Sequence, residues 1–256
     1  MRKRLQPHIM CGVGDVAKYV LVSGDPKRVE KIAASFDESS KVADYRGFIT
    51  YTGSVDGIGI SASSTGIGCP SAAIVVEELA RVGAEVFIRV GTAGALQPEI
   101  EVGDIVIATA AVRADGASKC IVPLEFPAVA DFDVTTALVE AARKLKQRVH
   151  FGPVLSSDLF YGDMESLRLW SKYNVLSVEM ESSVIFTIAN LKKLKAGAIL
   201  AVDGNPVLGI GKGEFEPGER TGELDQRVQD AIRNEALIAI EAVRVLENMS
   251  KARRVK

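Results

Sequence analysis

The sequence contains few of the residues that build metal centres and disulfide frameworks. Its 256 residues include three cysteines and two histidines. Cys11, Cys69 and Cys120 are odd in number and lack CxxC spacing, so we expect neither a disulfide framework nor a zinc site. We therefore expect no metal, and we interpret the thiols as ordinary packing groups of a cytoplasmic protein.

An excess of charge and long apolar segments are also lacking. The chain has 31 Lys and Arg against 33 Asp and Glu, which gives a formal net charge of −2. This balance excludes binding to nucleic acid or an anionic membrane through bulk charge, so any anion must bind in a local pocket. No uncharged apolar run approaches the ~20 residues that span a bilayer. Gln6, Pro7 and His8 stand where the apolar part of a signal peptide would begin, so no targeting signal is expected.

The chain shows no Ser/Pro-rich linker or charge block that would divide it. A prior of ~150 residues per domain allows two domains, but strand and helix signals alternate throughout, so we predict a single domain over residues 1–256. Short β-branched runs predict strands at 19–23, 57–63, 86–90, 104–108, 175–178 and 196–202. Periodic apolar runs predict helices at 26–36, 70–82, 135–145, 182–191 and 223–248. Several strands are apolar almost throughout, which is typical of a sheet covered by helices on both faces.

Ligands of open α/β sheets bind beyond the carboxyl ends of the strands, so polar groups that follow strands are the first candidates. After the strand at 19–23, Gly24 lets an anion approach the backbone and Arg28 lies one turn into the next helix. This motif indicates a phosphate site. Taken alone, however, the motif favours the other reading, an ordinary strand-to-helix turn with a solvent-facing arginine.

Arg89 lies inside the otherwise apolar strand at 86–90, where an unpaired charge would be costly. Either it pairs with a buried glutamate, or its guanidinium reaches a phosphate beyond the strand end. The segment 91–94, Gly-Thr-Ala-Gly, is interpreted as a turn, and the Thr92 hydroxyl favours the phosphate alternative. A dinucleotide site is not supported, since GxGxxG spacing is absent both here and at 66–68.

Two further carboxylate motifs end predicted strands. Glu179 and Glu181 stand at i and i+2, so in extended chain they point to one side and could bind a diol such as the ribose hydroxyls. Alternatively, one of them caps the next helix and pairs with Arg89, and both readings can hold together. Asp203 follows the strand at 196–202; Asp-Gly there is common turn chemistry, and only together with the other motifs is it a candidate general acid.

Taken together, these segments resemble the hexameric nucleoside phosphorylases, which include uridine phosphorylases and the trimer-of-dimers purine nucleoside phosphorylases. The resemblance runs through nearly the whole chain. It is carried by residues 24–29, 64–68, 77–79, 89–94, 112–118, 125–132 and 178–181. It implies a three-layer α/β/α sandwich with a central mixed twisted β-sheet, and no cofactor, because inorganic phosphate is a substrate.

The resemblance also implies roles for individual residues. Phosphate would be bound by Gly24, Arg28, Arg89 and Thr92, with Arg46 from a neighbouring subunit. Ribose would contact Glu181, the Met180 backbone and His8 of the neighbour, and Phe160 would lie against ribose and base. Without the resemblance, His8 would be read as a frayed terminal residue and Phe160 as core. Since His8 and Arg46 would complete a neighbour's site, a homohexamer built as three dimers is expected.

The preferred base depends on two regions. Uridine phosphorylases of this family read uracil with a Gln and an Arg, and here Met164 and Ser166 occupy those positions. Residues 197–206, which contain Asp203, are similar to the apicomplexan purine nucleoside phosphorylases, in which the Asp protonates the purine, although the aromatic residue expected within 207–211 is missing. We therefore predict inosine or guanosine as substrate, with uridine as the alternative.

The predicted chemistry is phosphorolysis of a glycosidic bond. Breaking this bond builds positive charge on the ribose and negative charge on the base, so an anion is needed below the sugar and a proton above it. Arg28, Arg89 and Arg46 would hold phosphate in line with C1′, and Asp203 would neutralise the leaving base. A hydrolytic nucleosidase on the same fold and a non-enzymatic nucleoside-binding protein are the other candidates, and the arginine set argues against the former.

Overall fold

The computed structural model describes residues 4–211 and 226–254. The strands are β1 (Tyr19–Ser23), β2 (Glu38–Tyr45), β3 (Phe48–Val55), β4 (Ile58–Ser64), β5 (Val86–Ala95), β6 (Ile105–Ala114), β7 (Ala128–Val129), β8 (His150–Ser157), β9 (Ser177–Glu179) and β10 (Lys195–Gly204). The helices are α1 (Pro26–Ala33), α2 (Cys69–Arg81), α3 (Ala117–Ile121), α4 (Phe132–Lys144), α5 (Met164–Lys172), α6 (Ser182–Leu191), the 3-10 turn η1 (Pro206–Leu208) and α7 (Gln226–Arg254).

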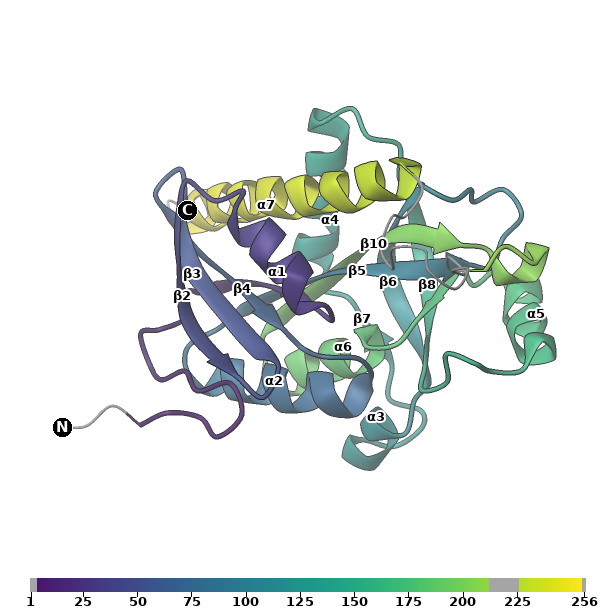
Figure 1. Cartoon of the computed structure of the whole chain (residues 1–256), viewed down its shortest axis with the longest axis horizontal. Helices are drawn as coiled ribbons and strands as arrows, with labels where there is room; N and C mark the ends of the chain where they lie inside the picture. The colour runs from purple at the N-terminus through teal and green to yellow at the C-terminus, as the bar shows by residue number, and fades with distance from the viewer. Residues whose placement is uncertain (1–3, 212–225, 255–256) are drawn as a thin grey trace, which may run out of the picture.

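The strands form one mixed sheet (Figure 1). Strands β4, β1, β5 and β10 pair in parallel in that order, whereas β2 pairs antiparallel with β3 and β3 pairs antiparallel with β4. At one side the sheet closes on itself, because β5 pairs with both β10 and β9 while β10, β6, β8 and β9 pair in succession. The predicted α/β fold with a central mixed sheet is confirmed. The closure was not predicted, and it brings the end of β9 beside β5 and β8.

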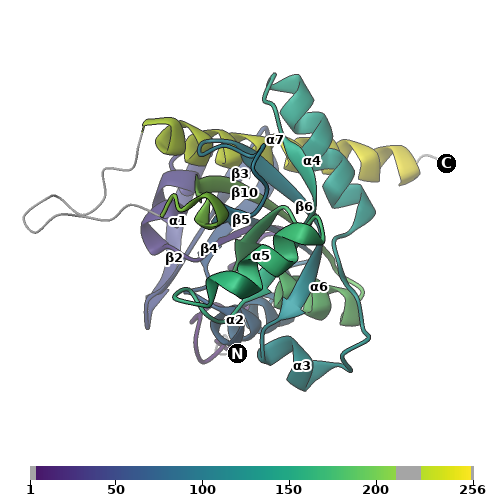
Figure 2. The same ribbon diagram turned by 90° about the vertical axis from the view of Figure 1, so that its right-hand side faces the viewer.

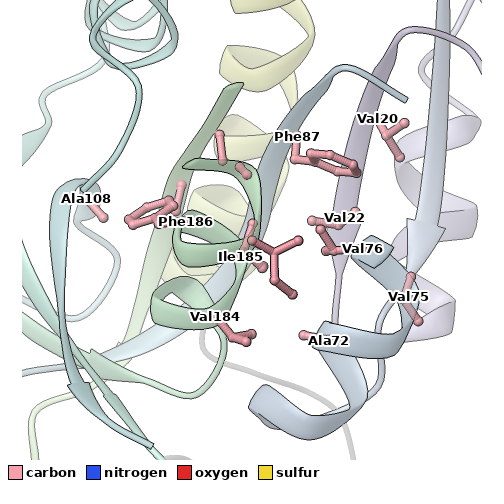
Figure 3. Close-up of a cluster of buried hydrophobic side chains, with 14 of the residues drawn as sticks. Val20, Val22, Ala72, Val75, Val76, Phe87, Ala108, Val184, Ile185 and Phe186 are labelled. Atoms are coloured by element: carbon pink, nitrogen blue, oxygen red, sulfur yellow. The ribbon is translucent and has the colours of Figure 1, made fainter. Parts of the chain in front are cut away.

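Helices cover both faces of the sheet. One core cluster contains apolar side chains of α2 and α6, and the other contains side chains of α1, α4 and α7. Figure 2 shows α4 next to α7 on one face and α6 on the other. Side chains of β5 alternate between the clusters: Phe87 packs with Val22, Val76 and Phe186 on the α2 and α6 face (Figure 3), and Ile88 faces the opposite cluster.

Local sequence explains where the helices begin. Pro26 stands in the first turn of α1, where no N–H partner is needed, and the Asp25 side chain accepts the Lys27 N–H as a cap. Helix α6 has the predicted bounds. Helix α7 packs on β5 and β10, as its apolar face predicts; the predicted residues 223–225 lie outside the described part of the chain. Helix α7 continues to Arg254, and near its end Arg253 pairs with Asp133 at 2.6 Å.

Two predicted turns are strand in the structure. The segment 91–94 belongs to β5, because β10 pairs alongside it as far as Gly94, where β9 also joins. Likewise Asp203 and Gly204 belong to β10, and the chain turns only at Asn205, whose side chain accepts the Leu208 N–H. Both strands therefore extend further towards the candidate site than their apolar runs suggest, since cross-strand pairing continues past the last large apolar residue.

Candidate active site

Arg89 lies at the centre of a buried ion cluster. Its side chain projects from β5 to the α2 and α6 face and is 5% exposed. Nε lies 2.7 Å from Glu179 Oε2, and Nη2 lies 2.5 Å from Glu181 Oε2. The first alternative for Arg89, pairing with buried glutamates, is thus confirmed, whereas a contact with phosphate stays a prediction.

Glu179 holds the start of helix α6. Its carboxylate accepts the backbone N–H groups of Glu181 at 2.9 Å and Ser182 at 3.0 Å. The Ser156 hydroxyl of β8 also donates to Glu179. These contacts confirm that one of the two acids caps the helix, and they fix Glu179 between β8, β5 and α6.

Glu181 is held from two sides. Oε1 accepts the Gly68 N–H at 2.6 Å, and Oε2 binds Arg89. The chain reaches this position through Gly66 and Gly68, which have φ of 67° and 89° and so favour glycine. Burial raises the pKa of Glu181, although Arg89 opposes the shift. Burial alone would lower the pKa of Arg89, but Glu181 and Glu179 outweigh it and raise that pKa.

Gly91 makes room for the Arg89 side chain. Both residues point to the same face of β5, and a Cβ added at Gly91 would lie 2.9 Å from the Arg89 guanidinium. Gly91 is therefore needed because it leaves space for the Arg89 side chain beside the strand, and not because it forms the turn that its sequence context suggests.

A second ion pair lies on the α7 face of the sheet. Arg28, in the first turn of α1, lies 3.6 Å from Oε1 of Glu235 in α7. Glu235 is fully buried, and its Oε2 accepts the Ala201 N–H of β10 at 2.8 Å. Burial raises the pKa of Glu235 to about 8, with Arg28, the Ala201 N–H and Arg89 opposing and Asp203 reinforcing the shift.

Asp203 is buried at the carboxyl end of β10, the same edge at which β5 ends. At that edge the chain after β1 approaches the chain after β4, since a Cβ at Gly24 would lie 3.2 Å from the Gly66 carbonyl oxygen. Thr92 is half-buried in β5. The structure thus brings the ends of β1, β4, β9 and β10 to the edge at which β5 ends. Asp203 lies in β10 just before that edge and Glu181 directly follows β9, while Arg28 lies in the first turn of α1 and Arg89 within β5.

His8 is ordered and not frayed. Nδ1 lies 2.6 Å from Oε1 of Glu78 in α2, and Glu78 Oε2 accepts the backbone N–H groups of His8 and Ile9 at 3.0 and 2.9 Å. Arg46 is exposed at the tip of the β2–β3 hairpin, where it and Gly47 have φ of 54° and 82°. Ser64 at the end of β4 donates to the Gly47 carbonyl, so this tip lies at the site edge of the sheet.

The residues expected near the base are less enclosed. Phe160 is 59% exposed and stacks edge-on against Tyr161, so the general expectation that a lone aromatic belongs to the core is wrong here. The carbonyl of Met180 accepts the Cys69 thiol at 3.3 Å. Cys11 and Cys69 are buried as packing groups, whereas Cys120 is exposed, which corrects that expectation for Cys120.

Glu78, Ser156 and Glu235 are contact residues that the motif analysis did not assign. Their partners lie at least 23 residues away in sequence, which no local pattern shows. Of these three residues, only Glu235 is visible in the sequence pattern. It directly precedes Ala236, which lies on the apolar face of α7, where a carboxylate is unexpected. Within residues 4–211 and 226–254, no cluster of His, Cys, Asp or Glu side chains is arranged to hold a metal ion, and no helix has the length and apolar character of a membrane span.

Comparison with known proteins identifies the family. A model of the Phosphorylase superfamily matches residues 18–244, and the chain belongs to this superfamily. The guanosine phosphorylase of Halorubrum lacusprofundi is 44% identical over 94% of this chain and 99% of its own length. The uridine phosphorylase of Thermococcus kodakarensis is 44% identical over 94% of this chain and 87% of its own length. The uridine phosphorylase of Escherichia coli is 46% identical over 73% of this chain and 79% of its own length.

These matches confirm the predicted nucleoside phosphorylase family and its enzyme class, the pentosyltransferases. They leave the particular likeness to apicomplexan enzymes, the single-domain boundary and the cytoplasmic location as predictions. Because these relatives include both a guanosine phosphorylase and uridine phosphorylases, the matches do not decide the base preference.

Proposed function

We propose that this enzyme cleaves purine nucleosides, in particular inosine and guanosine, with inorganic phosphate to give the free base and ribose 1-phosphate. The observation that carries the proposal is the position of Asp203, a buried carboxyl group at the sheet edge where Arg89 and Glu181 lie. Purine N7 can accept a proton from such a group, whereas uracil has no equivalent nitrogen there. The similar guanosine phosphorylase of H. lacusprofundi supports this choice.

The Arg89 guanidinium would donate hydrogen bonds to the two glutamates and to phosphate at the same time. A guanidinium has five N–H donors, and its ion pairs with Glu179 and Glu181 use Nε and Nη2. Other donors of Arg89, with Arg28, Thr92 and the backbone at Gly24, would hold the phosphate below C1′. Such positioning contributes at most ~7–11 kcal/mol to lowering the barrier.

Glu181 and the Met180 backbone would bind the ribose hydroxyls. In the structure Glu181 already accepts from Gly68 and Arg89, which orient its carboxylate. A carboxylate with two fixed donors keeps further lone pairs, so a diol can bind without breaking these contacts. Phe160, exposed beside Tyr161, would close over ribose and base.

The proposed assembly is a hexamer of three dimers, in which His8 and Arg46 of one subunit complete the site of the next. Arg46 is exposed at a tight hairpin, and His8 keeps 34% of its side chain exposed while Glu78 fixes the ring. Ordered but accessible polar groups of this kind suit a contact with a neighbouring subunit.

Asp203→Asn tests the purine assignment. The amide keeps the size of the side chain but cannot transfer a proton, so kcat/KM for inosine should fall by about 10²–10⁴ and that for uridine should change little. Equal losses for both substrates, or no loss, would show that Asp203 has no part in purine leaving-group protonation.

Uridine is the second candidate substrate, because the similar enzymes of T. kodakarensis and E. coli are named uridine phosphorylases. Met164 and Ser166 argue against it, because neither side chain presents the paired amide and guanidinium contacts of the uracil readers. A wild-type kcat/KM higher for uridine than for inosine and guanosine would make uridine phosphorolysis the function.

A further inference from the structure

The charges at the proposed phosphate site are unusual for a site that binds a dianion. On this chain, Arg28 and Arg89 face Glu179, Glu181, Glu235 and Asp203. If all of these groups were ionised, the acids would outnumber the arginines by two. With Asp203 protonated as the proposed general acid and Arg46 supplied by the neighbouring subunit, three acids would still face three arginines. A dianion bound there therefore favours a state in which one further acid carries a proton.

Glu235 is the acid best placed to do so. It is fully buried on α7, and its Oε1 makes no hydrogen bond within the described part of the chain, while Arg28 Nη1 lies 3.6 Å away. Its Oε2 is held by the Ala201 N–H, two residues before Asp203. By contrast, both oxygens of Glu179 have donors: Oε1 accepts from the Ser156 hydroxyl and the Ser182 N–H, and Oε2 accepts from the Glu181 N–H and pairs with Arg89.

We propose that Glu235 is a positioning residue of the phosphate site, which holds Arg28 between α1 and α7 and is protonated while the phosphate dianion is bound. In molecules in which Glu235 is ionised beforehand, it takes up a proton from solvent as the dianion binds. The inference rests on the proposed function, because it takes Arg28 as a phosphate ligand. No bond other than the Glu235 O–H forms, and the proton returns to solvent when the anion leaves.

The charged groups that act on Glu235 set the direction of the effect. They are Arg28 of α1, Arg89 of β5 and Asp203 of β10. Burial places the pKa of Glu235 at about 8 in the absence of phosphate. A dianion beside Arg28 draws on the positive charge that stabilises the Glu235 carboxylate, so the bound state favours the protonated form.

The test compares wild type with Glu235→Gln, which keeps an acceptor for the Ala201 N–H but cannot titrate. If phosphate binds only with Glu235 protonated, linkage predicts that the wild-type KM for phosphate rises about tenfold between pH 7 and pH 9 relative to the variant. The ionisation of phosphate itself cancels in this ratio. The KM for nucleoside should not show the same divergence.

Glu241→Gln is the matched control, because Glu241 is also a buried acid of α7 but binds Lys144 and Arg244, away from the site. It should follow the wild-type pH profile. If Glu235→Gln does not fold, Glu235→Met removes the same titrating group with a side chain of similar volume. Identical phosphate KM profiles in wild type and in the folded Glu235 variant would overturn the proposal.

A binding measurement separates this proposal from the proposed function. Calorimetric titration of the wild-type protein with inorganic phosphate, in buffers of different ionisation enthalpy, should show proton uptake near pH 8 beyond that in Glu235→Gln. This holds whether or not any nucleoside is cleaved. Phosphate binding with no difference in proton uptake between the two proteins would overturn the role of Glu235, whereas the absence of phosphorolysis would overturn the proposed function alone.

Discussion

Arg89→Met should destabilise the fold, and should do so more strongly as pH rises. The substitution leaves two buried carboxylates without their shared cation. In the variant, Glu179 keeps the hydrogen bonds donated by Ser156, Glu181 and Ser182. Among the described contacts, Glu181 keeps one hydrogen bond, which the Gly68 N–H donates. Removing one partner of a buried ion pair costs about 3–5 kcal/mol, a large part of a typical folding free energy of about 5–15 kcal/mol.

Protonation limits this cost and gives it a pH dependence. In the variant, Glu181 can lose its unpaired charge by taking up a proton. For a carboxyl group with a reference pKa of 4.5, protonation costs about 3–4 kcal/mol at pH 7 and under 1 kcal/mol at pH 5. In the variant, the folded state then holds more protons than the unfolded state above pH 4.5. Stability therefore falls as pH rises, by up to about 1.4 kcal/mol per unit and per acid.

Urea unfolding of wild type and variant at pH 5, 7 and 8, at one protein concentration, measures the effect. Arg113→Met is the control, because Arg113 donates to the Ser118 hydroxyl and to backbone carbonyls of residues 118–126 and has no buried carboxylate partner in the described contacts. Its cost should not depend on pH in this range. An Arg89→Met penalty that is equal at pH 5 and pH 8 would refute the reasoning, as would one below about 1 kcal/mol at pH 7.

Three further outcomes are expected. Gly91→Ala should raise the KM for phosphate at least tenfold, because a Cβ there lies 2.9 Å from the Arg89 guanidinium, whereas Gly59→Ala, with its nearest contact at 3.5 Å, should not; equal effects would contradict the packing argument. Glu78→Ala should raise hydrogen exchange at His8 and Ile9 and the KM for nucleoside, and unchanged exchange would show that Glu78 does not hold this segment. Glu235→Gln should gain stability relative to wild type as pH rises from 5 to 8. Because the pKa of Glu235 is raised in the folded state, folding of the wild type takes up a proton, and this uptake becomes less favourable as pH rises. A stability difference that stays constant over this pH range would contradict this.

The sequence predicted best the elements that are buried on both sides. Strand β1 and helix α6 have the bounds that their apolar runs predict. The β2–β3 hairpin was missed because β2 is an exposed edge strand with few buried positions, so no apolar pattern marks it. Strand β8 was missed for a similar reason, since half of its length is only partly buried.

The site was predicted as a set of strand ends and not as a set of contacts. Arg89, Glu179, Glu181 and Asp203 were visible because each interrupts or ends an apolar run. The pairing of Arg89 with Glu179 and Glu181 depends on the closure of the sheet through β9. The apolar run at 175–178 predicts a strand there, but no local pattern reveals that this three-residue strand lies between β5 and β8. Glu235 could not be linked to Arg28 because the two residues are more than 200 positions apart.

The most direct test of the account is base release from inosine, guanosine, adenosine and uridine, each measured with and without inorganic phosphate. Release should depend on phosphate, yield ribose 1-phosphate, and have its highest kcat/KM with inosine or guanosine. Base release at the same rate without phosphate would identify a hydrolase, binding without release would identify a nucleoside-binding protein, and either result would contradict the central claim.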